Sequence, residues 1–136
     1  MINPIEHART KEAAKKYKVE PYVIAADIYG AGNLSGRGGW TWYTGSSSWY
    51  YVAGIEYILG LKIKNETMYF EPCVPKDWDE YKMVYKWGKS IYHITVKNNS
   101  KQNNGTKKVF LDGVEIDNSI KLNSHIEKAF YVDVIL

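Results

Sequence analysis

The chain has 136 residues, 45% of them apolar and 24% charged, so it can form one domain with a real core or a small domain with an appendage. The net charge is only +3, and 16 of the 18 basic residues are scattered lysines, which argues against a nucleic-acid partner. The single cysteine, Cys73, excludes a disulfide framework within the chain and cannot by itself form a metal site.

The amino terminus is polar throughout, so we expect no signal peptide. No apolar run approaches the length of a membrane span. We therefore expect a cytoplasmic location, with no membrane segment and no bound cofactor.

Aromatic residues make up 15% of the chain, with twelve Tyr and five Trp. This composition leaves two interpretations open. Aromatic side chains favour β-strands, so a β-rich core would account for them. Flat apolar rings with polar rims also suit the faces of pyranoses, so the aromatics could instead serve sugar recognition.

The first twenty residues predict two short helices. Asn3-Pro4-Ile5-Glu6 has the order of a helix start, with Asn as N-cap and Pro in the first turn. Thr10 offers a second cap, for a Lys-rich helix over residues 11–18. Glu20-Pro21 is expected to end that helix, because a residue before proline avoids the helical conformation.

Residues 22–29 form an apolar run with one carboxylate, Asp27. The run is too short for its periodicity to distinguish helix from strand, and we expect it to be buried in either case. A buried carboxylate needs a partner or a purpose, so Asp27 is a candidate for a structural hydrogen bond or for contact with a ligand. Residues 30–39 are rich in glycine and predict a loop, which carries Arg37.

From about Ser46, apolar residues recur at helical spacing and predict a helix that Gly60 ends. Trp49 and Val52 share one face of this helix, while residues such as Tyr50 make its other sides apolar as well. A helix that is apolar on all sides is surrounded by protein, as the inner helix of a larger assembly would be.

The pattern changes after residue 63. Short strand-like runs follow, at residues 67–71, 81–87, 91–97, 109–111 and 126–136. Tight hairpin turns are expected at Gly88-Lys89 and at Asp112-Gly113. Helices followed by strands predict an α+β fold, with residues 1–63 mostly helical and residues 64–136 an antiparallel β-sandwich.

The predicted start of the third helix is a candidate anion site. Thr44 and Gly45 lie where backbone N–H groups and the positive end of the helix dipole are available, which suits phosphate. A plain N-cap would explain the same residues. Arg37 is the nearest cation in the sequence, and it could equally be an ordinary surface arginine.

Three segments resemble a known enzyme family, in their order and spacing. They are VEPYVIAADIYG (19–30), GRGGWTWYTGSSSWYYVAGIEYILGL (36–61) and EPCVPKDW (71–78). They are similar to the carboxyl-terminal end of the cellobiose phosphorylase and cyclic β-1,2-glucan synthetase family, glycoside hydrolase family 94. The motif RGGWTWYTGS, without a Gln in residues 22–30, resembles the cyclic β-1,2-glucan synthetase branch most.

The resemblance implies an inverting glycoside phosphorylase in which phosphate, the co-substrate, attacks the anomeric carbon of a β-glucan while one carboxylic acid protonates the leaving oxygen. It implies that residues 1–63 are the last helices of an (α/α)₆ barrel. It assigns Thr44 and Gly45 to the phosphate site and places the general acid upstream of Met1. Neither Asp27 nor Asp77 matches the motif of that acid.

We therefore expect a carboxyl-terminal fragment that supplies part of a phosphate site and is inactive alone. Asp27, Arg37, Trp40 and Trp42 are the candidate substrate-binding residues. Two alternatives remain: a non-catalytic carbohydrate-binding module that uses Trp40 and Trp42, or a structural subunit of a split enzyme. In the last case the apolar helix would drive self-association or pairing with the missing barrel.

Overall fold

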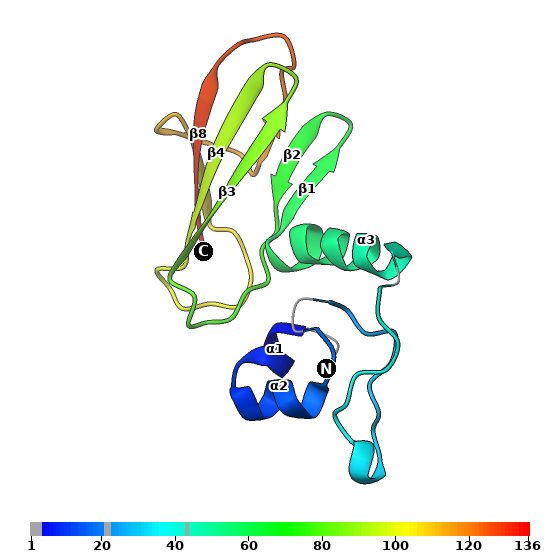
Figure 1. Cartoon of the computed structure of the whole chain (residues 1–136). Coiled ribbons are helices and arrows are strands. Elements are labelled where there is room, and N and C mark those ends of the chain that lie inside the picture. Colours follow the sequence, from blue (N-terminus) through cyan, green and yellow to red (C-terminus); the bar gives the residue numbers. More distant parts are fainter. Residues whose placement is uncertain (1–3, 21–22, 43) are drawn as a thin grey trace. The chain divides into compact units, whose positions relative to one another are not determined.

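The computed structural model describes residues 4–20, 23–42 and 44–136, and only the backbone of Thr44 and Ser46. It divides into two compact units, Met1–Tyr51 and Val52–Leu136 (Figure 1). The first unit contains helices and irregular chain, and the second contains every described β-strand. The observed order of helices before strands confirms the α+β class. The assignment of residues 1–63 to a barrel remnant and 64–136 to a separate sandwich domain stays a prediction.

Two short helices begin the first unit, α1 (Pro4–Ala8) and α2 (Lys11–Tyr17), as expected. The Thr10 hydroxyl caps α2 by accepting the N–H of Ala13 at 3.1 Å. Lys18, with a left-handed φ of 59°, ends the helix, and its N–H donates to the Ala14 carbonyl. The helix thus stops before the expected Glu20-Pro21, and the expected cap Asn3 lies outside the described residues.

The described part of the run 22–29 is buried only in part. Val23 and Ala25 are buried with Tyr17, whereas Asp27 and Tyr29 are exposed. The expectation that the whole run is buried was therefore wrong. These residues form one side of an irregular loop rather than a helix or a strand, so part of the run faces solvent.

A long helical segment follows the glycine-rich loop, which itself contains the short 3₁₀ helix η1 (Gly32–Leu34). Helix α3 spans Thr44–Val52 and continues without interruption as the π-helix η2 (Ala53–Ile58). Gly60, with a φ of 77°, follows its end, as the sequence predicted. Several aromatic side chains of this segment are exposed rather than enclosed, among them Trp49 (79%) and Tyr51 (71%).

Two sheets form the second unit. The first sheet is antiparallel and has the order β1 (Leu61–Lys64), β2 (Thr67–Phe70) and β7 (Ser119–Lys121). The second has the order β3 (Glu80–Trp87), β4 (Ser90–Lys97), β8 (Ala129–Ile135), β5 (Lys108–Leu111) and β6 (Val114–Ile116).

The expectation of a purely antiparallel sandwich needs one correction. Strand β8 pairs with β4 in parallel, with Ile91 opposite Ala129 and Lys97 opposite Ile135. Between these two strands the chain forms β5 and β6 and then crosses to the other sheet as β7. It returns to place β8 antiparallel to β5 and parallel to β4, so the five-stranded sheet is mixed.

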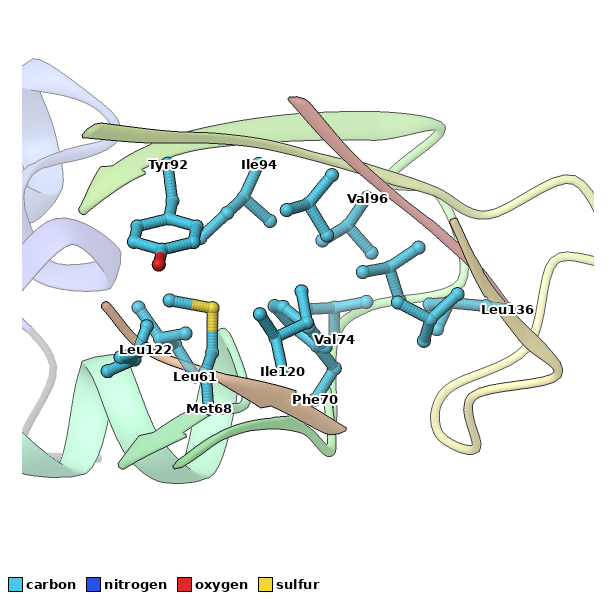
Figure 2. Packing of buried hydrophobic residues seen from close by; sticks show 13 residues of the cluster. Leu61, Met68, Phe70, Val74, Tyr92, Ile94, Val96, Ile120, Leu122 and Leu136 are labelled. Atoms are coloured by element: carbon cyan, nitrogen blue, oxygen red, sulfur yellow. The ribbon is translucent and has the colours of Figure 1, made fainter. Parts of the chain in front are cut away.

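Thirteen buried hydrophobic side chains pack between the two sheets (Figure 2). Tyr92, Ile94 and Val96 point inward from alternate positions of β4, as the period-two pattern predicts. Met68 and Phe70 of β2 meet them from the opposite sheet. The interdigitated side chains confirm a sandwich with a continuous apolar core.

Hairpin turns set the register of the sandwich. Gly88-Lys89 joins β3 to β4 and Asp112-Gly113 joins β5 to β6, both as predicted. The sequence reading missed the hairpin of β1 and β2, in which Asn65 and Glu66 have left-handed φ values of 50° and 55°. These values match a two-residue type I′ turn, which glycine does not supply here.

Candidate functional site

Residues 26–40 form an irregular hairpin in the first unit. The N–H of Ala26 donates to the carbonyl of Trp40 at 2.6 Å, and the N–H of Tyr29 donates to the carbonyl of Arg37 at 2.9 Å. Ile28 and Gly38 form an antiparallel bridge between these two bonds. The hairpin therefore brings Asp27 beside Trp40, two of the residues that the sequence singled out as substrate-binding candidates.

The carboxylate of Asp27 is occupied by the backbone. Its Oδ1 accepts the backbone N–H of Trp40 at 3.2 Å. The backbone carbonyl of Asp27 accepts the N–H of Gly39 at 2.9 Å. A side chain on Gly39 would overlap the Asp27 carboxylate, so only glycine fits there without a shift. Of the two roles considered for Asp27, the structure shows the structural hydrogen bond.

Trp42 is held by a carboxylate that the sequence reading did not select. Its indole Nε1–H donates to Oε1 of Glu20 at 3.1 Å, and the residue has a left-handed φ of 68°. Hydrogen bonds from the backbone N–H of Glu20, the Trp42 indole and Thr41 lower the pKa of Glu20. From the sequence, Glu20 was predicted only to end a helix before proline, and nothing in its spacing indicates a partner 22 residues away.

The proposed anion-binding residues lie at the start of α3. Thr44 is the first residue of the helix, and its side chain lies outside the described residues. Gly45 is exposed, and apart from its chain neighbours and the backbone of its own helix, no described atom lies within 4 Å of the place where a side chain on it would begin. The first turn of a helix offers N–H groups that lack intrahelical acceptors, so a ligand can approach the backbone at Gly45.

Three basic side chains of the first unit have different surroundings. Arg37 is exposed on the hairpin and makes no ion pair with any residue that the structure describes. Arg9 pairs with Glu6 at 2.7 Å, and His7 stacks on the ring of Tyr17 with centroids 4.5 Å apart. Arg37 is thus the better candidate to meet an anion, although no described contact joins it to Gly45.

The sandwich has a hollow of about 430 Å³ beside Phe70, but its polar side chains serve the fold. The amide of Asn118 and the hydroxyl of Thr106 both donate to the carbonyl of Phe70, at 2.9 and 2.8 Å. Within the described parts of the chain, no three His, Cys, Asp or Glu side chains gather as metal ligands would. No helix among the described residues is long and apolar enough to cross a membrane.

Comparison with known proteins decides the family. Residues 1–60 match the model of the glycosyl hydrolase 94 superfamily, catalytic domain. Over 125 residues, or 92% of this chain, the sequence is 42% identical to the cyclic beta-(1,2)-glucan synthase NdvB of Rhizobium meliloti. The chain belongs to the glycosyl hydrolase 94 superfamily.

Other members of the superfamily are similar over most of the chain. The N,N'-diacetylchitobiose phosphorylase of Vibrio proteolyticus is 34% identical over 88% of it, and the solabiose phosphorylase of Paenibacillus borealis is 31% identical over 71%. The chain is much shorter than these relatives, since it spans 4% of the glucan synthase, 15% of the chitobiose phosphorylase and 13% of the solabiose phosphorylase.

All the candidate site residues lie within the part that matches the glycosyl hydrolase 94 catalytic domain. They come from the hairpin (Asp27, Arg37, Trp40), from the segment that follows it (Trp42) and from the start of α3 (Thr44, Gly45). The described contacts join Asp27 to Trp40 and Glu20 to Trp42. The match therefore covers the irregular half of the protein and ends where β1 begins.

Proposed function

We propose that this chain is part of an inverting glycoside phosphorylase or a cyclic β-1,2-glucan synthase-type enzyme, and that it contributes Thr44 and Gly45 to a phosphate site. The proposal depends chiefly on the position of these two residues in the first turn of α3, inside the segment that matches the catalytic domain. Two of the relatives described above are named as phosphorylases, which supports phosphate as the co-substrate.

The helix start alone would hold phosphate weakly. A helix dipole contributes about 0.3–1 kcal/mol to binding an anion. Even millimolar affinity requires about 4 kcal/mol. Cationic side chains must supply the difference, and Arg37, exposed on the hairpin, is our candidate within this chain. We expect further cations and the general acid to come from polypeptide outside these 136 residues.

The resemblance implies that phosphate attacks the anomeric carbon directly while a carboxylic acid protonates the leaving oxygen. No carboxylate of this chain matches that acid, and general acid catalysis contributes about 10²–10⁴-fold to a rate. We therefore expect the isolated chain to release no glucose 1-phosphate from β-1,2-gluco-oligosaccharides and phosphate at an enzyme-like rate. Turnover at such a rate would overturn the view of the chain as an incomplete site.

Two glycines of the same helical segment provide a sharp test of the phosphate site. A methyl group on Gly45 or on Gly54 would meet no described atom within 4 Å beyond its own helix turn, and neither glycine has a positive φ, so both Ala variants should fold. Gly45→Ala places its methyl group where phosphate approaches the backbone. We expect about tenfold weaker phosphate binding, the cost of one hydrogen bond to a charged group.

The matched variant Gly54→Ala should bind phosphate as the wild type does, because Gly54 lies in η2, away from the start of the helix. Because the chain alone should bind phosphate more weakly than millimolar, titration followed by ³¹P NMR up to about 100 mM phosphate measures both variants. Equal affinity of Gly45→Ala and the wild type would show that phosphate does not bind at Gly45.

A carbohydrate-binding module is the second candidate, because Trp40 and Trp42 are 73% and 65% exposed. Calorimetric titration with β-1,2-gluco-oligosaccharides separates the two functions. Binding that is lost in Trp40→Ala and Trp42→Ala but does not respond to phosphate would favour the module.

The exposed Trp49 and Tyr51 of α3 support a further proposal, that the chain self-associates or pairs with further polypeptide through this helix.

A further inference from the structure

Trp42 has a backbone conformation that its surroundings must stabilise. Its φ of 68° lies in the left-handed region, which residues with a side chain adopt at an energetic cost because Cβ approaches the following carbonyl oxygen. Such conformations persist where several contacts fix them, and they concentrate at ligand sites. The contacts of Trp42 therefore indicate which part of its side chain a ligand could reach.

Two carboxylates fix the segment that contains Trp42. Oε1 of Glu20 accepts the indole Nε1–H of Trp42 at 3.1 Å, and Glu20 also accepts a hydrogen bond from Thr41. On the other side of Thr41, Asp27 accepts the backbone N–H of Trp40 at 3.2 Å. Three consecutive residues are thus held by acidic groups that precede the glycine-rich loop.

The held indole is 65% exposed. Its one polar hydrogen is already used by Glu20, so what Trp42 offers to a ligand is its apolar ring face. An aromatic ring face in a fixed orientation packs well against the axial C–H groups of a pyranose ring. A side chain that is already ordered also loses less entropy when a ligand binds.

Glu20 itself is largely occupied. A carboxylate accepts about four hydrogen bonds. Glu20 already receives its own backbone N–H, the indole of Trp42 and Thr41. These same bonds lower the pKa of Glu20, and an ionised carboxylate is a strong acceptor for the indole N–H. Its chemistry is that of a group that positions another side chain rather than one that contacts a sugar.

From this arrangement we propose that Glu20 is the positioning residue of a sugar subsite at Trp42: its carboxylate fixes the indole so that the exposed ring face stacks on a neutral pyranoside. The inference rests on the proposed function, because it takes a carbohydrate as the ligand. It adds two things to that function: a role for Glu20, which does not contact the reacting atoms, and stacking on the Trp42 ring as the mode of sugar contact.

Calorimetric titration of the full 136-residue chain with β-1,2-gluco-oligosaccharides tests the proposal. We expect Glu20→Ala to weaken binding about three- to tenfold, which is the cost of ordering one side chain on binding. Glu20→Gln keeps an oxygen acceptor of the same length, so it should change the affinity less than twofold. Glu12→Ala, an exposed glutamate of α2 in the same unit, should bind as the wild type does.

A spectroscopic readout separates positioning from a general loss of fold. The indole Nε1–H of Trp42, assigned by its absence from the NMR spectrum of Trp42→Phe, should exchange slowly with water in the wild type and in Glu20→Gln. It should exchange rapidly in Glu20→Ala, while the other indole signals stay unchanged. Loss of all indole signals together would mean that Glu20→Ala is unfolded. The glucan affinity of Trp42→Phe then decides, because this variant keeps an aromatic ring and removes the donor to Glu20. Weaker binding than that of the wild type supports the positioning role, and equal binding contradicts it.

The possible failures are distinguishable. If Trp42→Ala weakens glucan binding and Glu20→Ala does not, Glu20 does not position the ring, and the proposed function stands. If phosphate binds through Gly45 but no variant alters glucan binding, the sugar subsite is not at Trp42. If the wild type binds neither phosphate nor glucan, the proposed function fails and the sugar subsite fails with it, whatever the exchange rate of the indole shows.

Discussion

In the β-sandwich, thirteen buried hydrophobic side chains form one cluster, whereas the described residues of the first unit contribute three: Tyr17, Val23 and Ala25. The sandwich also has long hydrogen-bond ladders, such as the eight residue pairs of β3 and β4. The first unit is instead held by caps, single hydrogen bonds and side chain–backbone contacts, of which Asp27 with Trp40 is one.

The candidate site residues all lie in the unit with the smaller core. Regions with few buried apolar contacts open locally at low free-energy cost, and ligand-binding segments are commonly found in them. The two units thus differ in the main contacts of their side chains. In the sandwich most of these contacts are core packing and strand pairing. In the first unit the described hydrogen bonds mainly fix exposed side chains, such as Trp42.

The largest expected effect comes from the core of the sandwich. Phe70→Ala removes a ring that is 1% exposed, and we expect a loss of about 3–5 kcal/mol in the free energy of unfolding. Urea denaturation measures it, and Val114→Ala, at a site 66% exposed, should stay within about 0.5 kcal/mol of the wild type. Amide exchange in residues 4–51 should be unchanged in Phe70→Ala. An equal loss of protection in both units would show that they unfold together.

A smaller effect is expected in the first unit. Thr10→Ala removes the cap of α2, whose hydroxyl accepts the N–H of Ala13, and should cost about 1 kcal/mol. Amide exchange of Ala13 and Ala14 should accelerate, while the sandwich keeps its protection. Thr10→Ser retains the hydroxyl and serves as the control. Unchanged exchange at Ala13 in Thr10→Ala would contradict a role of the cap in holding α2.

Much of the difference between the sandwich and the first unit could be predicted from the sequence. Strand-like runs predicted β3 and β4, and Thr10 predicted the start of α2, because each signal is local. Strands β6 and β7 have three residues each, too few for an alternation to be recognised, and β1 follows so closely on the helical pattern that the sequence did not separate it. The parallel pairing of β4 with β8 depends on the path of the whole chain, and no local pattern carries it.

The site was predicted less completely than the fold. Thr44 and Gly45 follow from the start of a helix, and their place in α3 is as expected. Glu20 could not be found from the sequence, because its bond to Trp42 requires the left-handed turn of the chain at Trp42, which its residue type disfavours. Asp27 drew attention as a buried carboxylate, but it is exposed and bonded to the backbone.

The smallest expected effect concerns the acid stability of the sandwich. The Nζ of Lys128 donates to Oδ2 of Asp112 at 2.7 Å, and the backbone N–H of Tyr131 donates to Oδ1 at 2.9 Å. The pKa of Asp112 is lowered from its usual 3.8, chiefly by the bond to Lys128. Because the pKa is lower in the folded state, the ionised carboxylate stabilises the sandwich above pH 3.8, and this stabilisation is lost as the pH falls through the lower, folded-state value.

Asp112→Asn should therefore lower the midpoint of thermal unfolding slightly at neutral pH. Between neutral pH and about pH 2 its midpoint should fall less than that of the wild type. Asn also accepts the left-handed φ of 49° at this position, so the turn is preserved. The exposed Asp117→Asn is the control. A wild type and Asp112→Asn that lose stability in parallel would show that this carboxylate does not contribute to the acid transition.

The position of β8 has a consequence for the order in which the protein can be made. This strand lies in the middle of its sheet, between β4 and β5, yet it follows every other strand in the chain. During synthesis, β3 with β4 and β5 with β6 can each form a hairpin early, but the two hairpins cannot join into one sheet until β8 has been made. The edges of β4 and β5 stay open until that strand is made, so a nascent chain is most exposed to wrong strand pairing in the interval between the synthesis of β5 and that of β8.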